Sequence, residues 1–207
     1  MTSPLVKICG LRDAQALEAA READFVGFVF YPASPRSLSP DQAIALAAVA
    51  PAGPKRVGLF VDATDALIAA ALPALDVIQL HGNEDPARVA EIRSHFGKPV
   101  MKAIGIGSEA DLRAIADFVP VADYLLLDAK PAELPGGNGT RFDWSLPRRA
   151  AIPRPWLLAG GLDAANVAAA LAESGAPGVD VSSGVEVSRG VKDPALIAAF
   201  VKAARGG

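Results

Sequence analysis

The sequence predicts a closed (β/α)8 barrel, the TIM-barrel architecture, with residues 1–207 forming a single domain. Short runs of Val, Ile, Leu and Phe alternate with longer Ala-rich amphipathic stretches, in units of about 25 residues. No linker, charge block or low-complexity tract interrupts this alternation, so nothing marks a domain boundary. The 207 residues are near the minimal length for this fold, so the loops must be short.

The predicted strands are nearly continuously apolar, which is typical of parallel strands covered by helices. They are expected at 5–9, 25–30, 56–61, 76–80, 99–104, 123–128, 156–160 and 178–182. Strict alternation with helices also permits an open, doubly wound sheet. Eight equal units without an edge-like strand favour the closed barrel.

The predicted helices follow the strands at 13–22, 40–50, 64–73, 86–95, 109–118, 145–150, 164–173 and 194–204. Three of them begin with proline after a residue that can cap a helix, namely Ser39, Asp85 and Asp193. Asp163 is expected to start the helix at 164–173 in the same way.

Composition argues against several classes of protein. A net charge of −3 and 6% aromatic residues disfavour binding to nucleic acid or anionic membranes. The single cysteine can form neither an internal disulfide nor a Cys-rich zinc site, and the two histidines lack metal-ligand spacing. Without a secretory signal or an apolar run near the ~20 residues of a membrane span, we expect a cytoplasmic protein.

The residues with chemical potential gather at the carboxyl ends of the predicted strands, where (β/α)8 barrels carry their active sites. Side chains two residues apart share a face of a strand, so Lys7 should point the same way as Cys9. An ammonium group there would help hold a thiolate. The alternative is that Cys9 is simply a small buried residue.

The same alternation pairs Gln79 with His81 and Asp180 with Ser182. Gln79 and His81 could line a site or pack beneath it. Asp128 ends an apolar strand, where desolvation can raise a carboxyl pKa and suit it to general acid catalysis. It could instead cap a helix or pair with Lys130 or Lys7. An acid at Asp128 and a base at Cys9 would flank a small substrate from opposite sides of the barrel mouth.

Two glycine-containing loops suggest an anion site after the last two strands. Gly160-Gly161 follows one strand and Ser182-Ser183-Gly184 follows the next, although both could be tight turns without a ligand. Arg36 lies in a loop that contains two prolines, where a restrained guanidinium could bind a carboxylate or remain solvated. The loop 131–142 is either a mobile lid or a tolerated connection.

Taken in order, these motifs resemble those of the phosphoribosylanthranilate isomerase family of tryptophan biosynthesis. The resemblance covers almost the whole chain. Its motifs are Lys7-Ile8-Cys9-Gly10, Gly27-Phe28-Val29-Phe30-Tyr31-Pro32 with Ser34-Pro35-Arg36, Val57-Gly58-Leu59-Phe60-Val61, Gln79-Leu80-His81-Gly82, Leu127-Asp128, Gly136-Gly137-Asn138-Gly139-Thr140 with Phe142-Asp143-Trp144, Ala159-Gly160-Gly161-Leu162, Gly178-Val179-Asp180-Val181-Ser182-Ser183-Gly184-Val185-Glu186 and Gly190-Val191-Lys192-Asp193.

The resemblance implies an Amadori rearrangement of N-(5'-phosphoribosyl)anthranilate to 1-(2-carboxyphenylamino)-1-deoxyribulose 5-phosphate. It implies that Asp128 is the general acid, that Cys9 is the general base and that Arg36 binds the anthranilate carboxylate. The remaining substrate contacts would come from Lys7, Gln79, His81, Gly160, Gly161, Asp180, Ser182, Ser183 and Gly184. We therefore expect a small phosphosugar substrate, no cofactor and no metal, in a monomer or a homodimer.

Other functions fit the sequence less well. A phosphosugar epimerase or lyase would usually carry metal-binding histidines or an acid pair at the strand ends. A related isomerase of a phosphoribosyl histidine precursor would be expected to have aspartate in place of Cys9. A non-catalytic phosphometabolite-binding protein would need the anion site but not both Cys9 and Asp128, and a structural protein would need none of these groups.

Overall fold

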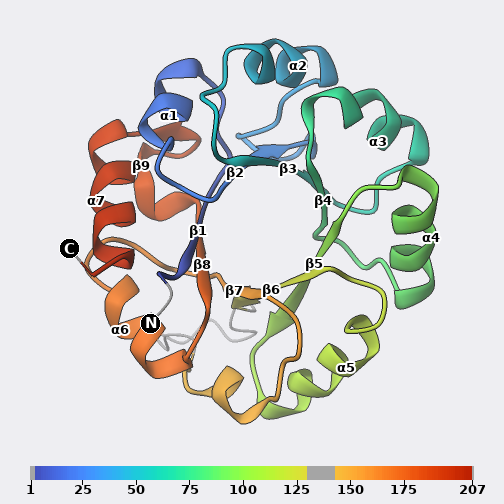
Figure 1. Cartoon of the computed structure of the whole chain (residues 1–207), viewed down its shortest axis with the longest axis vertical. Coiled ribbons are helices and arrows are strands. Elements are labelled where there is room, and N and C mark those ends of the chain that lie inside the picture. Colours follow the sequence, from blue (N-terminus) through green and yellow to red (C-terminus); the bar gives the residue numbers. More distant parts are fainter. Residues whose placement is uncertain (1–2, 130–142, 207) are drawn as a thin grey trace.

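Eight parallel strands close into a barrel, because the first strand, β1 (Leu5–Cys9), pairs with the last, β8 (Gly178–Val181). The computed structural model describes residues 3–129 and 143–206. Helices form an outer ring around the strands (Figure 1). The predicted closed (β/α)8 barrel is thereby confirmed, and the open sheet is excluded. The predicted lid or loop at 131–142 lies outside the described residues.

The strands between these two lie close to their predicted positions. They are β2 (Phe25–Val29), β3 (Lys55–Phe60), β4 (Val77–Leu80), β5 (Val100–Ile106), β6 (Tyr124–Ala129) and β7 (Trp156–Leu158). β7 ends before the predicted residue 160, because Gly160 and Gly161 adopt positive φ angles of 95° and 67° that an extended strand does not use. A short hairpin of β9 (Glu186–Ser188) and β10 (Val191–Lys192) follows β8 and was not predicted.

Three helices begin directly after the capping residues that the sequence predicted. These are α2 (Pro40–Ala48), α4 (Pro86–Phe96) and α7 (Pro194–Ala204), in which the side chains of Ser39, Asp85 and Asp193 accept hydrogen bonds from the first turn. The other α-helices are α1 (Ala14–Ala19), α3 (Asp65–Ala71), α5 (Ala114–Phe118) and α6 (Val167–Ser174). Short 3-10 helices occur at η1 (Leu72–Ala74), η2 (Glu109–Arg113), η3 (Leu146–Arg149) and η4 (Ser183–Val185).

Three helix predictions were wrong in detail. The segment 109–118 divides into η2 and α5, and 145–150 forms only η3, where Pro147 has no N–H to donate and too few residues follow to extend a helix. Asp163 does not cap a helix at residue 164. Its Oδ1 accepts from the amides of Ala165 and Asn166 in a turn, and α6 begins at Val167.

Alternating side chains of the strands build two layers of core. The inner layer is formed by Phe25, Val57, Val77, Met101, Ala103, Leu126, Leu157 and Ala159. The outer layer joins the strands to the helices and includes Val6, Ile8, Phe28 and Phe60. Two polar side chains, Lys7 and Gln79, are completely buried on strand positions that share the inner face. In the described ranges, every helix is too short or too polar to cross a bilayer.

Candidate active site

A cavity of about 390 Å³ opens at the carboxyl ends of the strands. Its walls bring together residues from seven strand ends, those of all the barrel strands except β5, and from the loop after β2. Of the predicted site residues, it is lined by Cys9, Arg36, His81, Asp128, Gly160, Gly161, Asp180, Ser182 and Ser183. This volume falls within the range of about 300–1,000 Å³ that is usual for small-molecule sites.

Three predicted contacts do not lie on the cavity wall. Lys7 and Gln79 precede the wall residues Cys9 and His81 by two positions, so they occupy the layer below and have no exposed surface. Gly184 lies in η4, where an added Cβ would collide with the carbonyl oxygen of Leu162. This glycine therefore allows the loops after β7 and β8 to touch through their backbones.

A larger cavity of about 680 Å³ lies elsewhere, between α5, η2 and η3. It is lined by Glu109, Arg113, Ile115, Arg149 and other residues of those elements. None of the predicted site residues reaches it. The smaller cavity at the strand ends is therefore the candidate active site.

Cys9 is the last residue of β1, opposite Gly27 in β2. A Cβ at position 27 would stand 3.0 Å from the sulfur, so glycine gives the thiol its space. Burial raises the pKa of Cys9, and the negative charge of Asp180 raises it further, whereas the ammonium groups of Lys7 and Lys192 lower it. The net shift is upward. Lys7 acts in the expected direction, because its ammonium lowers the pKa of Cys9, but desolvation outweighs the two cations.

Lys7 and Asp180 form a buried ion pair below the thiol. Lys7 Nζ donates to Asp180 Oδ1 at 2.8 Å, with side chains that are 0% and 9% exposed. Burial alone would lower the pKa of Lys7, but Asp180 and Cys9 reverse that effect and raise it. Lys7 thus remains a cation within the inner layer of the barrel.

Asp128 contacts a histidine on the cavity wall, whereas Lys7 pairs with Asp180 and Lys130 lies outside the described residues. Asp128 Oδ2 lies 3.2 Å from His81 Nε2, and the side-chain amide nitrogen of Gln79, Nε2, lies 2.9 Å from His81 Nδ1. With that amide as donor, the neutral imidazole carries its proton on Nε2, facing Asp128. Gln79 therefore orients the ring that contacts the proposed acid.

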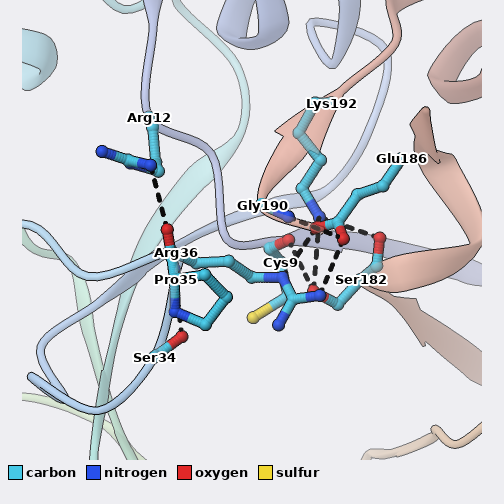
Figure 2. A network of polar contacts seen from close by, with 9 residues as sticks. All are labelled: Cys9, Arg12, Ser34, Pro35, Arg36, Ser182, Glu186, Gly190 and Lys192. Atoms are coloured by element: carbon cyan, nitrogen blue, oxygen red, sulfur yellow. Dashed lines mark hydrogen bonds and ion pairs between the residues drawn. The ribbon is translucent and has the colours of Figure 1, made fainter. Parts of the chain in front are cut away.

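Glu186, from β9, connects the cations beside the cavity (Figure 2). Arg36 donates to it from Nε at 2.6 Å and from Nη2 at 2.8 Å. Lys192 Nζ donates to its Oε1 at 2.8 Å, and the Gly190 amide donates to its Oε2 at 3.1 Å. Burial alone would raise the pKa of Glu186, but these hydrogen bonds lower it to about 2.

Lys192 also connects this cluster to the end of β8. Its Nζ donates to the carbonyl oxygen of Ser182 at 2.8 Å, while Ser182 Oγ donates to the carbonyl oxygen of Cys9 at 3.2 Å. Burial lowers the pKa of Lys192, partly offset by Glu186 and Cys9. Among the residues that the structure describes, no group of three or more His, Cys, Asp or Glu side chains is arranged to hold a metal ion.

The model of the N-(5'-phosphoribosyl)anthranilate (PRA) isomerase family matches residues 6–203. The chain belongs to this family. It is 52% identical to the PRA isomerase of Rhodospirillum rubrum, over 100% of both chains. It is 55% identical to that of Paracoccus denitrificans, over 95% of this chain and 94% of the relative.

Solved structures of PRA isomerases share the architecture. The crystal structure from Thermotoga maritima has a TM-score of 0.88 at 37% identity and covers 99% of this chain and 100% of that one. A PRA isomerase in complex with reduced 1-(o-carboxyphenylamino)-1-deoxyribulose 5-phosphate has a TM-score of 0.85 at 36% identity, with the same coverage. A 3-hexulose-6-phosphate synthase, at 18% identity and a TM-score of 0.70, shares the fold.

Sequence reasoning missed two charged side chains beside the cavity. Glu186 and Lys192 belong to motifs of the family resemblance but were assigned no role, because Glu and Lys side chains usually face solvent. Their side chains are only 4% and 1% exposed. The contact between His81 and Asp128 was also missed, since it joins the ends of β4 and β6, which flank β5, and no local spacing indicates it.

Proposed function

We propose that this chain, acting as one domain over residues 1–207, catalyses the PRA isomerase reaction of tryptophan biosynthesis. The substrate would be N-(5'-phosphoribosyl)anthranilate and the product 1-(2-carboxyphenylamino)-1-deoxyribulose 5-phosphate. One observation carries this proposal: a thiol and a carboxyl, Cys9 and Asp128, share one cavity with an arginine and with two glycine-containing loops. Membership of the PRA isomerase family supports the same reaction.

Asp128 would act first, as a general acid. It donates a proton to the furanose ring oxygen, the bond from that oxygen to C1′ breaks, and a cationic iminium forms between C1′ and the anthranilate nitrogen. The proton remains on the sugar as a hydroxyl. His81 Nε2, 3.2 Å from Asp128 Oδ2, is placed to donate a hydrogen bond that orients the carboxyl, and solvent returns the proton that Asp128 gives up.

Cys9 would then act as the general base. The thiolate removes the proton from C2′, and the electron pair of that C–H bond neutralises the iminium to give an enolamine. Enol-to-keto tautomerisation yields the product. The iminium places a positive charge beside the thiol only after ring opening, so it adds to Lys7 and Lys192 in opposing the burial that raises the pKa of Cys9.

The two anionic ends of the substrate would bind on opposite sides of the reacting carbons. The phosphate suits the backbone amides of Gly160, Gly161, Ser182 and Ser183, where positive φ angles and the absence of side chains at the glycines permit close approach. The anthranilate carboxylate suits Arg36, which lies on the cavity wall with a side chain that is 19% exposed. Gly184 allows the two loops to approach through their backbones, and Asp180 pairs with Lys7 below Cys9.

The proposal is tested by adding purified protein to N-(5'-phosphoribosyl)anthranilate and following the loss of substrate. We expect Cys9→Ala and Asp128→Ala each to lower kcat by on the order of 10²–10⁴, as for other general acid–base groups. Binding of the reduced product analogue should remain, because neither group is the main anion contact. Asp117→Ala, which removes an exposed carboxylate of α5, is the matched control and should leave kcat unchanged.

Absence of turnover by the wild-type protein would exclude the proposed reaction. Near wild-type kcat in one of the two variants would exclude the role assigned to that residue. Loss of analogue binding together with turnover would assign the residue to binding rather than to proton transfer.

A further inference from the structure

We infer that Glu186 is a positioning residue that fixes the direction in which Arg36 presents its guanidinium to the carboxylate of the substrate. The inference rests on the proposed function, because it assigns to Arg36 the anthranilate carboxylate. It concerns a side chain that contacts Arg36 and does not touch the reacting carbons. Glu186 would therefore contribute to recognition of a carboxylated aromatic ring and not to proton transfer.

Glu186 and Arg36 form a two-bond pair that uses one edge of the guanidinium. A guanidinium has five N–H donors in one plane, and Glu186 occupies the side formed by Nε and Nη2, at 2.6 and 2.8 Å. Neither bond uses Nη1. Within residues 3–129 and 143–206, no hydrogen bond uses the outer edge of the guanidinium, formed by Nη1 and the second N–H of Nη2, so this edge can receive another planar acceptor. Figure 2 shows Arg36 extended across the site, with the guanidinium close to Cys9.

Glu186 is itself immobilised. Its side chain is 4% exposed, and it receives four hydrogen bonds, two from Arg36 and one each from Lys192 and the Gly190 amide. These donors keep the carboxyl ionised, with a pKa of about 2. A fixed carboxylate of this kind can hold a guanidinium in one orientation before a ligand arrives.

The aliphatic part of the Arg36 side chain is confined as well. A Cβ at Gly10 would lie 2.5 Å from Arg36 Cδ, so the arginine stem fills the space above that glycine. The Arg36 amide donates to Ser34 Oγ at 3.2 Å, and Arg12 donates to the Pro35 carbonyl oxygen at 2.9 Å. With backbone and stem held, the head group retains mainly rotation about its last bonds. Glu186 removes that freedom.

A consequence for specificity follows. One planar edge of Arg36 remains, and its fork geometry matches a carboxylate. Loss of Glu186 would let the guanidinium rotate, so that part of the binding energy for a carboxylated ring would be spent on ordering it. A ligand without the carboxylate makes no use of that edge and would bind equally well with or without Glu186.

The experiment compares two ligands on two proteins. The ligands are reduced 1-(o-carboxyphenylamino)-1-deoxyribulose 5-phosphate and the same compound without its carboxyl group, and Kd is measured by calorimetry. Glu186→Gln should weaken binding of the carboxylated ligand about tenfold and that of the other ligand less than about twofold. With the natural substrate, KM should rise by a similar factor while kcat stays nearly constant.

The matched control is Asp76→Asn. Asp76 holds Arg56 in the same two-bond geometry, with Nε and Nη2 each at 2.9 Å, but at the amino ends of β3 and β4, away from the cavity. Neither Kd should change. If Glu186→Gln does not fold, Glu186→Asp keeps the charge beside Lys192 with a shorter side chain and is compared on the same two ligands.

Equal weakening for both ligands would show a merely structural role and overturn the inference, as would a fall in kcat at constant KM. Tighter binding of the carboxylated ligand would show that Glu186 competes for Arg36, and would overturn it as well. Turnover by the wild-type protein tests the proposed function separately. The inference about Glu186 can therefore fail while that function stands.

Discussion

At the scale of single residues, the thiol of Cys9 lies under two opposing influences. Burial raises its pKa, and the ammonium groups of Lys7 and Lys192 lower it without compensating fully. A thiol whose pKa is raised reacts more slowly with oxidants and alkylating agents, because the thiolate is the reactive form. In the mechanism proposed above, the substrate therefore helps to generate the thiolate.

This balance predicts how the thiol titrates. Since Cys9 is the only cysteine, alkylation of the whole protein reports this residue alone. A raised pKa means that the thiolate forms at higher pH in the folded protein than in the unfolded chain. The pH midpoint of the alkylation rate should therefore lie higher for native protein than for the same protein in guanidinium chloride.

The midpoint, and not the absolute rate, is the quantity to compare, because burial also slows access of the reagent at every pH. A native midpoint at or below the unfolded one would contradict the dominance of desolvation. Alkylation in the presence of the reduced product analogue serves as the control for access through the cavity.

At the scale of elements, the loops after β7 and β8 depend on each other. Gly184 lies so close to Leu162 that a Cβ would meet its carbonyl oxygen, and both loops line the proposed phosphate side of the cavity. A backbone atom cannot turn aside as a flexible side chain can. A side chain at position 184 must therefore move one loop relative to the other.

We expect Gly184→Ala to raise KM about tenfold or more, because a displacement of the phosphate loops of even 1 Å is costly to a positioned substrate. The control is Gly97→Ala. Gly97 ends α4 with a φ of 64° and has open space around its Cα, so alanine there should cost about 1 kcal/mol of stability through backbone strain. Thermal denaturation and steady-state kinetics of both variants separate the two effects. Unchanged KM in Gly184→Ala would contradict the coupling of the loops.

The elements that sequence reasoning predicted well are those with a local physical signal. Apolar runs marked the eight strands, and proline after Ser39, Asp85 or Asp193 marked three helix starts. The β9–β10 hairpin had no such signal, because its strands are only three and two residues long and expose Val187 and Val191. The cluster of Glu186, Arg36 and Lys192 depends on that hairpin and was missed with it.

At the scale of the whole molecule, the barrel closes at the seam between β1 and β8. Leu5 pairs with Gly178, where a Cβ would approach Leu5 within 2.8 Å, so a glycine allows the two strands to meet. Two residues further along each strand, Lys7 lies directly opposite Asp180, and their side chains form the buried ion pair. The charges thus lie on the seam itself, on the inner face of the strands.

Asp180→Asn should therefore destabilise the whole barrel. It leaves Lys7 as a buried cation without its counter-charge, which typically costs about 3–5 kcal/mol. Unfolding by guanidinium chloride measures the loss. Glu18→Gln, which removes a surface pair with Arg21 whose side chains are both 60% exposed, should change the free energy of unfolding by less than about 1 kcal/mol. Equal stability of the two variants would contradict the role of the seam.

The same distinction, between local sequence signals and contacts distant in the sequence, explains how much of the site could be predicted. Strand ends and two-residue alternation sufficed to bring Cys9, Asp128, Asp180 and Ser182 to one end of the barrel. These two signals do not indicate which side chains from different strands contact one another. The choice of His81 for Asp128, and of Glu186 for Arg36, depends on where side chains from distant strands converge.

The seam also sets when the site comes into existence. Lys7 and its partner Asp180 are 173 positions apart, the former near the amino terminus and the latter on the last barrel strand. Until β8 docks, the thiol of Cys9 and the ammonium of Lys7 border an open sheet edge that faces water. A growing or partly folded chain therefore carries an unprotected cysteine beside an unpaired strand, and only completion of the barrel encloses both.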